Sequence, residues 1–356
     1  MIRFPANTKI DTFFIFKHTI RVNNNLVKGV RRGIDMIDAM HNENMESEGK
    51  EIKDTHEYMK IEGQNLCNKK GSPLFPELIL VKSVAEYLDA VDFIFTTLCN
   101  DNQGSNCQLW YRGHVQESFD LLPTITREKG GLQLNPLFET AFLSKFKSAA
   151  IAYVEKLPKF PLNDDVNAYW NWLFILRHYG LPARILDWSR DALTGLFFAT
   201  NPEDPCLTPG VNAAVWLLNP VRLNESFSFH SFLKPGYIPS VEEPSFNLFF
   251  GPESDILNTL KPAAAIGPLN TTRIVAQRGT FTVFPRVKTL LALNKFEDSN
   301  KYLTKIMIDC NSIDKIQTQL RHYGITRLAL YPDMESIASE VFQEVIDEGI
   351  NTTEIK

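Results

Sequence analysis

Three short segments of the sequence place arginine, histidine or other polar side chains between strongly apolar neighbours. They are Trp110–His114, Arg177–Ser189 and Ile274–Phe281. Arginine, histidine and aspartate are the side chains that bind anions, transfer protons and stabilise positive charge in active sites. Because Arg112 and the segment Arg184–Asp187 lie at the ends of apolar stretches, we expect them to line one cleft. These segments are therefore the candidate functional site.

The same residues also have a purely structural interpretation. Arg112, Arg184 and Asp187 could form a buried ion pair that fixes loops. His178 lies at the end of a predicted helix, where a histidine often caps the last carbonyl groups or packs in the core. Gln277 could serve only as a hydrogen-bonding side chain of a sheet. Both interpretations stay open at this stage, and the grouping of the charged side chains in space distinguishes them.

Hydrophobic spacing predicts the helices and strands that carry these segments. Helices are expected after Ser83, from Asn135–Pro136, over 166–179, after Ser189, over 312–323 and from Pro332 to about 347. Strands are expected at 108–111, 213–218, 306–308 and 326–331, and as two strands broken at Arg278–Gly279 within 273–284. Since the two kinds of element follow one another without regular alternation, we predict an α+β fold with a mixed, mainly antiparallel sheet and flanking helices.

One five-residue motif occurs twice. Leu176–Gly180 and Leu320–Gly324 both read Leu-Arg-His-Tyr-Gly. Each copy ends a predicted helix, and basic residues in a last turn followed by glycine are favoured at a helix C-terminus. The flanking sequences do not match, so we interpret the motif as convergent capping and not as an internal duplication.

The first 75 residues differ from the rest of the chain. They are polar, their charges alternate in sign, and few of their apolar residues follow a helical or strand pattern. Such segments pack poorly because they have little apolar surface to bury. We therefore expect residues 1–75 to form a polar, partly disordered N-terminal extension, and residues 76–350 to form the main domain.

The composition excludes several classes of protein. The chain has 37 Lys and Arg residues against 42 Asp and Glu residues, a net charge of −5, which argues against binding duplex nucleic acid or an anionic membrane through bulk charge. Phe13–Phe16 is followed at once by Lys17, and no run approaches the ~20 apolar residues of a membrane helix. The five cysteines form no C-x-x-C pair, which predicts unpaired thiols and no metal site. We therefore expect a cytoplasmic protein.

The polar segments together resemble the FRG-domain family, which is named for a Phe-Arg-Gly signature. The signature reads Tyr111–Gly113 here, with tyrosine in the place of phenylalanine. The resemblance covers about residues 81–345, with a motif core at about 105–220. Further matching motifs are Leu121–Arg127, His178–Ser189, Ala276–Phe281 and Leu330–Asp333. Members of the family are mostly bacterial and are discussed beside toxin and phage-defence systems, so the resemblance implies a role in bacterial defence or toxicity.

A weaker resemblance is to the Arg-Ser-Glu class of ADP-ribosyltransferases, which carry an aromatic-Arg-Gly motif at the end of a first strand. It implies an ADP-ribosyltransferase-like fold and an enzyme that uses NAD as a substrate, with no prosthetic group and with a protein or nucleic acid as acceptor. The residues that it implies for NAD binding are Arg112, Gly113, His178 and Arg184. Those that it implies for catalysis are Asp187, Ser189 and Gln277. Gln277 lies where the catalytic glutamate of that class would be sought.

The alternative is a non-catalytic binding or sensor domain that recognises a ligand, a nucleic acid or a phage protein. A pocket that brings Arg112, Arg184 and a carboxylate together favours the enzyme. Dispersal of these groups into separate ion pairs favours the binding domain. The sequence leaves open whether the protein is an enzyme.

Overall fold

The structure is a computed structural model, and all residues that it describes belong to the unit Tyr58–Lys356. The described residues are 79–99, 107–129, 132–133, 136–150, 152–153, 166–226, 236–252, 254, 261–287 and 289–347. The predicted N-terminal extension, residues 1–75, lies outside these ranges and stays a prediction.

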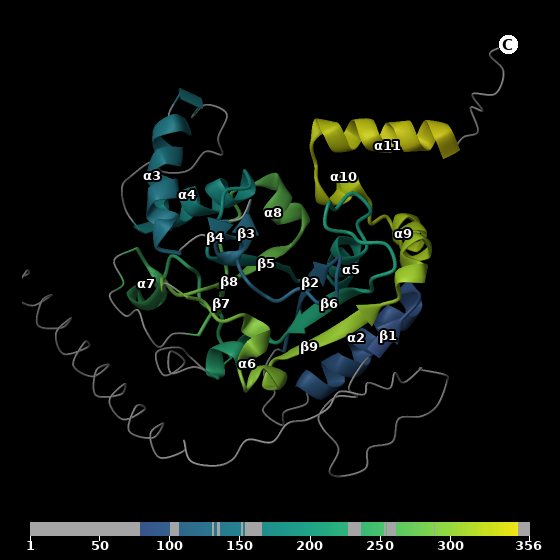
Figure 1. The fold of residues 1–356 in the computed structure, drawn as a ribbon, viewed down its shortest axis with the longest axis horizontal. Coiled ribbons are helices and arrows are strands. Elements are labelled where there is room, and N and C mark those ends of the chain that lie inside the picture. Colours follow the sequence, from purple (N-terminus) through teal and green to yellow (C-terminus); the bar gives the residue numbers. More distant parts are fainter. Residues whose placement is uncertain are drawn as a thin grey trace, which may run out of the picture. The chain divides into compact units, whose positions relative to one another are not determined.

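A mixed sheet forms the centre of this unit (Figure 1). Its strands are β1 (Ile79–Val81), β2 (Trp110–His114), β5 (Ile185–Ser189), β6 (Ala213–Leu218), β7 (Ala263–Ala265), β8 (Gly279–Val283) and β9 (Leu303–Ile308). In the described part of the chain the strand order is β1-β9-β6-β2-β5-β8-β7, and every neighbouring pair is antiparallel except β1–β9. A separate ribbon joins β3 (Glu128–Lys129) to β4 (Leu132–Gln133). The predicted α+β fold with its mainly antiparallel sheet is therefore confirmed.

Helices pack on the sheet because its strands alternate apolar side chains between two faces. In β6, Val215 and Leu217 belong to one core cluster, and Trp216 and Leu218 to another. The helices are α2 (Val84–Cys99), α3 (Glu139–Ala150), α4 (Val166–His178), α5 (Ala192–Ala199), α6 (Pro220–Glu225), α7 (Pro244–Phe250), α8 (Thr272–Ala276), α9 (Ile313–His322), α10 (Arg327–Leu330) and α11 (Met334–Asp347).

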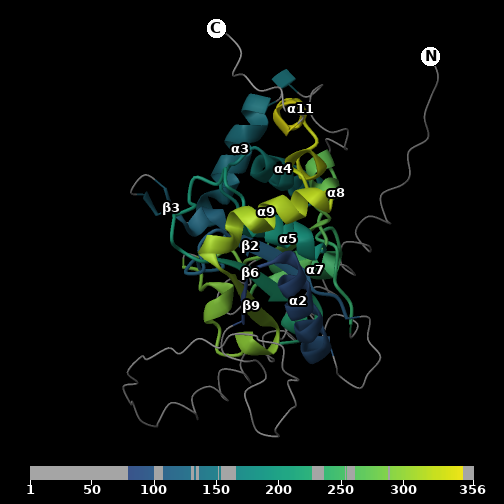
Figure 2. The same ribbon diagram turned by 90° about the vertical axis from the view of Figure 1, so that its right-hand side faces the viewer.

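Two groups of helices cover the two halves of the sheet. Helices α2, α5 and α9 pack against β1, β9, β6 and β2, as Figure 2 shows from the side of α9. Helices α3, α4 and α7 pack against β5, β8 and β7. None of the helices in the described ranges combines the length and the hydrophobicity that a membrane span needs.

The two halves of the sheet meet through a single registered pair of residues. Tyr111 of β2 lies opposite Ser189 of β5, whereas β2 pairs with β6, and β5 with β8, along their whole lengths. Beyond this pair β2 and β5 separate. Backbone groups of β5 that face the gap then need hydrogen-bond partners other than a neighbouring strand.

Two predicted strands are helices in the structure. The segment 273–277 lies largely within α8, and 326–331 contains α10. Each of these helices begins with a threonine cap: the side-chain oxygen of Thr271 accepts a backbone hydrogen bond at 3.2 Å, and that of Thr326 does the same at 3.2 Å. These caps favour a helical turn over the extended conformation that the apolar composition indicated. The other predicted elements within the described ranges are confirmed to within a few residues.

Both copies of the repeated motif end a helix in the same way. Gly180 and Gly324 have φ angles of 80° and 76°, a left-handed conformation that glycine adopts without strain. In each copy the residue after the glycine donates a hydrogen bond to the carbonyl group five residues earlier, at 3.1 Å in the first copy and 2.9 Å in the second. This is the Schellman cap, which supports the interpretation of the motif as a capping sequence.

The expectation of unpaired cysteines was wrong for one pair. Cys99 and Cys107 form a disulfide with their Cα atoms 5.5 Å apart, within the usual range for such a bond. Cys99 ends α2 and Cys107 lies just before β2, so packing of the two elements brings together thiols whose spacing in sequence gave no sign of pairing. Cys206 and Cys310 are free.

A buried ion pair joins α3 to the start of β5. Arg184 is fully buried, and its Nε donates a hydrogen bond to Glu139 Oε1 at 2.8 Å. Its two amino groups donate to the carbonyl oxygens of Phe284 and Phe250, at 2.8 and 2.6 Å. Burial alone lowers the pKa of Arg184, but Glu139 and the hydroxyl of Tyr169 raise it by more, so the net shift is upward. The charge is therefore kept in the core by its partners.

Replacing Glu139 by alanine should destabilise the fold by about 3–5 kcal/mol, because it leaves the charge of Arg184 buried without its partner. Urea unfolding followed by circular dichroism measures this loss. The matched control is Glu335→Ala, which removes a carboxylate that is 85% exposed and 3.7 Å from Arg327 and should cost much less. Equal small losses in both variants would show that the Glu139–Arg184 pair does not hold the core.

Candidate functional site

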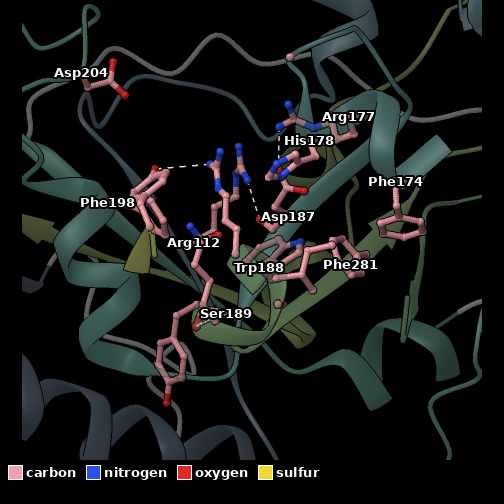
Figure 3. Close-up of a pocket in the computed structure, with 18 residues that line it drawn as sticks. Arg112, Phe174, Arg177, His178, Asp187, Trp188, Ser189, Phe198, Asp204 and Phe281 are labelled. Carbon is pink, nitrogen blue, oxygen red and sulfur yellow. Dashed lines mark hydrogen bonds and ion pairs between the residues drawn. The ribbon is translucent and has the colours of Figure 1, made fainter. Parts of the chain in front are cut away.

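A cavity of about 300 Å³ opens where β2 and β5 separate (Figure 3). Its wall comes from segments that are far apart in the sequence: β2, the end of α4, β5, the end of α5, α8 and the residue that follows α10. Its charged lining residues are Arg112, Arg177, Asp187, Asp204 and Arg273. The structure thus places Arg112 and Asp187 in one cleft.

Arg112 bridges the gap between the two halves of the sheet. Its Nη1 donates a hydrogen bond to the carbonyl oxygen of Asp187 at 2.5 Å, and its Nε donates to His114 Nε2 at 3.2 Å. Because His114 Nε2 accepts this bond, the proton of the imidazole belongs on Nδ1, which lies 3.2 Å from the carbonyl oxygen of Phe119. Two of the three guanidinium nitrogens of Arg112 are therefore occupied within the protein, and Nη2 is left for a ligand.

The charges around Arg112 fix its protonation and that of His114. Burial and the guanidinium groups of Arg127 and Arg177 lower the pKa of Arg112 to about 9, against the opposing effect of Asp187, so Arg112 stays charged at neutral pH. Burial, Arg112 and Arg127 lower the pKa of His114 to about 2. His114 is consequently a neutral acceptor and does not exchange protons near neutral pH.

Asp187 presents an ionised carboxylate to the cavity. Its Oδ2 accepts a hydrogen bond from Arg177 Nη2 at 2.6 Å, and 42% of its side chain is exposed. Burial alone would raise the pKa of Asp187, but Arg177, Arg112 and Arg273 outweigh it and the pKa is lowered. A group with a lowered pKa stabilises the fold at neutral pH and loses that effect as the pH falls through the lowered value. Asp187 is thus a charged acceptor under ordinary conditions.

Arg273 is a site residue that the sequence did not single out. It lies on α8, and its guanidinium group lies over the ring of Tyr331, 4.4 Å from the centroid, with Nη2 3.4 Å from the phenolic oxygen. Within the described residues it has no ion pair with a carboxylate. Its position was hidden because the segment was expected to be a strand, and the cap at Thr271 is the signal that could have corrected this.

His178 lines the cavity from the last turn of α4. Burial and the nearby charge of Arg273 lower its pKa. The ring is therefore neutral at pH 7 and can donate or accept a hydrogen bond with a ligand.

Ser189 and Gln277 line the cavity, but internal hydrogen bonds use the hydroxyl of Ser189 and the amide nitrogen of Gln277. Ser189 Oγ donates to the carbonyl oxygen of Gln277 at 2.7 Å and accepts from the backbone N–H of Asp191 at 2.9 Å. Gln277 Nε2 donates to the carbonyl oxygen of Leu330 at 3.1 Å. These bonds tie β5 to α8 and α10, so both side chains hold the wall of the cavity in place.

Arg184 is the one predicted binding residue that is not among the lining residues. It lies three residues before Asp187, about 10 Å away along an extended strand, and its guanidinium group belongs to the buried pair with Glu139. Sequence proximity to Asp187 was therefore a misleading guide to its position. The carboxylate that pairs with Arg184 is Glu139 of α3, far from Asp187 in the sequence.

The cavity favours a negatively charged ligand. Three guanidinium groups line it against two carboxylates, and Figure 3 shows Asp204 apart from the cluster around Asp187. Arginine groups that converge in a partly buried space bind phosphate or carboxylate strongly, because the attraction is screened less than in water. No three His, Cys, Asp or Glu side chains of the described residues are grouped so that they could hold a metal ion.

Comparison with protein families gives one match. The FRG domain model matches residues 107–206. The chain contains an FRG domain. The matched segment includes β2, α4, β5 and α5, and it therefore supplies Arg112, Arg177 and Asp187 to the cavity. Neither the curated proteins nor the solved structures include a match to the chain.

The glycine of the FRG signature has a packing role in this domain. A Cβ atom on Gly113 would lie 2.2 Å from the backbone nitrogen of Ala199 and 2.4 Å from the carbonyl oxygen of Gly195. Helix α5 thus crosses β2 at a distance that only glycine permits. In the signature, Gly113 therefore allows α5 to pack on β2, and the adjacent Arg112 reaches across the gap to β5.

Gly113→Ala in the FRG domain should lower the free energy of unfolding by about 1–3 kcal/mol, because α5 must move away from β2 to admit the methyl group. Thermal melting and urea unfolding both report this change. An unchanged stability would contradict the close packing of α5 on the signature glycine.

Proposed function

We propose that the cavity of this FRG domain binds a phosphorylated nucleotide, and that NAD, the ligand implied by the ADP-ribosyltransferase resemblance, is the first candidate. The observation that carries the proposal is the convergence of three guanidinium groups, from β2, α4 and α8, on one cavity. Guanidinium and phosphate groups match in both geometry and charge, so such clusters are characteristic of phosphate-binding sites.

The available space also suits a nucleotide. A volume of about 300 Å³ is at the lower end of the range for small-molecule pockets. A second cavity, of about 1050 Å³, shares Tyr331 and Asp204 with the first, so a dinucleotide has room to continue beyond it. Phe198 contributes an aromatic ring to the wall, and aromatic rings are suitable partners for a base.

The three arginines have different parts in this proposal. Arg273 has no carboxylate partner among the described residues and contacts only the ring and hydroxyl of Tyr331, so we assign it as the principal phosphate ligand. Arg177 binds both the carboxylate of Asp187 and the phosphate. Arg112 contributes charge and Nη2 but mainly positions Asp187, because its other nitrogens are already bonded.

Arg273→Gln should weaken the binding of ADP-ribose by about 10- to 100-fold, the loss expected for one charge-assisted contact worth about 1.5–3 kcal/mol. Isothermal titration calorimetry measures the change. Arg222→Gln on α6 is the matched control, because it removes the same charge from a residue that does not line the cavity. If wild-type protein binds neither ADP-ribose nor inorganic pyrophosphate, the phosphate-binding proposal is wrong.

A second candidate function is cleavage of the bond between nicotinamide and ribose, and the position of Asp187 favours it. When the C1′–N bond of NAD breaks, its electron pair leaves with nicotinamide and positive charge develops on the ribose. An ionised carboxylate that faces the cavity can stabilise this charge or orient a ribose hydroxyl. The acceptor, water or a macromolecular nucleophile, then bonds to C1′ and loses a proton. Without this chemistry the domain is a sensor of the same ligand, and the separate pairing of Arg184 with Glu139, away from Asp187, supports this alternative.

Asp187→Asn should reduce nicotinamide release from labelled NAD by about 100-fold or more, because the amide cannot balance the developing positive charge. ADP-ribose affinity should change much less, since the arginines remain. Asp204→Asn is the control with the same change of charge at the edge of the cavity. A wild-type protein that binds ADP-ribose and releases no nicotinamide would support the sensor and contradict the enzyme.

The biological setting belongs to the same proposal. The family resemblance supports a role in bacterial defence or toxicity, with action in the cytoplasm on a protein or nucleic acid acceptor. A toxic activity that depends on the cavity should be lost together with ligand binding in Arg273→Gln.

A further inference from the structure

Helix α11 has its apolar side chains turned away from the domain. Met334 is 77% exposed and Phe342 is 69% exposed. The exposed apolar side chains of this helix recur three or four positions apart, which places them in one stripe. They are Met334, Ile337, Val341, Phe342, Val345 and Ile346. The stripe covers the length of the helix, so it is a continuous surface and not a scatter of single residues.

The opposite face of α11 is polar and is attached to the domain. Ser336 is fully buried, and its Oγ accepts a hydrogen bond from Arg327 Nε at 3.2 Å. Glu340 accepts a hydrogen bond from Thr326 Oγ1 at 2.8 Å. In Figure 1 the helix lies beyond α10, at the outside of the described unit. An amphipathic helix of a globular protein usually turns its apolar face inward, and here polar contacts hold it the other way round.

Acidic residues flank the apolar stripe and restrict what can cover it. Glu335 lies along one edge and Glu344 along the other, and α11 contains no lysine or arginine. An anionic membrane or a nucleic acid would be repelled by these edges. A second copy of the helix would bring like charges together. A partner helix with an apolar face would cover the stripe, and lysine or arginine at its edges would pair with the acidic residues.

We propose that the exposed face of α11 is the docking surface for a basic amphipathic helix of a partner protein. The proposal does not rest on the cavity between β2 and β5 or on its ligand, although Glu344 of α11 also lines the second cavity. A 14-residue helix is about 21 Å long, so the contact is small and suits a transient interaction.

The test uses two labelled helical peptides with the same leucine face, one flanked by lysines and one by glutamates. Fluorescence anisotropy with the full chain should show binding of the lysine peptide and much weaker binding of the glutamate peptide. Phe342→Glu should weaken the binding of the lysine peptide about 10-fold or more, because it removes a central apolar contact. Phe95→Glu makes the same substitution at an exposed phenylalanine of α2, away from α11, and should leave binding intact. Circular dichroism checks the fold of both variants, and Phe342→Ala replaces Phe342→Glu if the latter unfolds.

Several results would overturn the proposal. Binding of neither peptide, or equal binding of both, contradicts the docking of a basic helix. A dimer in light scattering that Phe342→Glu dissociates would show that a second copy covers the stripe. Binding to phosphatidylserine vesicles that the same variant abolishes would show that a membrane does.

Discussion

The hydrogen bond from Arg112 to the carbonyl oxygen of Asp187 joins the two halves of the sheet at their weakest point. The strands β2 and β5 share only the pair of Tyr111 and Ser189, and beyond it no residue of β2 pairs with Asp187. A buried carbonyl group without a partner is costly, and the guanidinium group supplies the missing donor at 2.5 Å. The gap can therefore stay open as a cavity without leaving the backbone unsatisfied.

The charges of the cavity follow from this arrangement. Arg112 needs a nearby anion to stay charged in a partly buried position, and Asp187 needs nearby cations to stay ionised. Arg177 and Arg273, which come from helices on the same half of the sheet as Asp187, add more positive charge than the carboxylate balances. The excess is what makes the cavity suitable for an anionic ligand. Gly113 contributes by allowing α5 to lie against β2, which brings Phe198 to the wall.

Elements with strong local signals were predictable from the sequence, and those that depend on tertiary contacts were not. The strand Ala213–Leu218 and the helix that ends at His178 have clear apolar patterns and clear stop signals. Helices α8 and α10 are one turn long and depend on single threonine caps, so their apolar residues suggested strands.

Arg184 and Asp187 are three residues apart, yet one lies in the core and the other at the cavity, because a separate carboxylate on α3 holds Arg184. Arg273 enters the site because α8 packs beside β8 and α10, and the Thr271 cap predicts the helix but not this packing.

The measurement that tests the account most directly is a crystal structure of the protein with ADP-ribose bound. We expect phosphate oxygens within hydrogen-bond distance of Arg177 and Arg273, the ribose facing Asp187, and Arg112 still bonded to the Asp187 carbonyl group. Phosphates bound outside this cavity, or Arg112 released from β5 to grip them, would contradict the central claim.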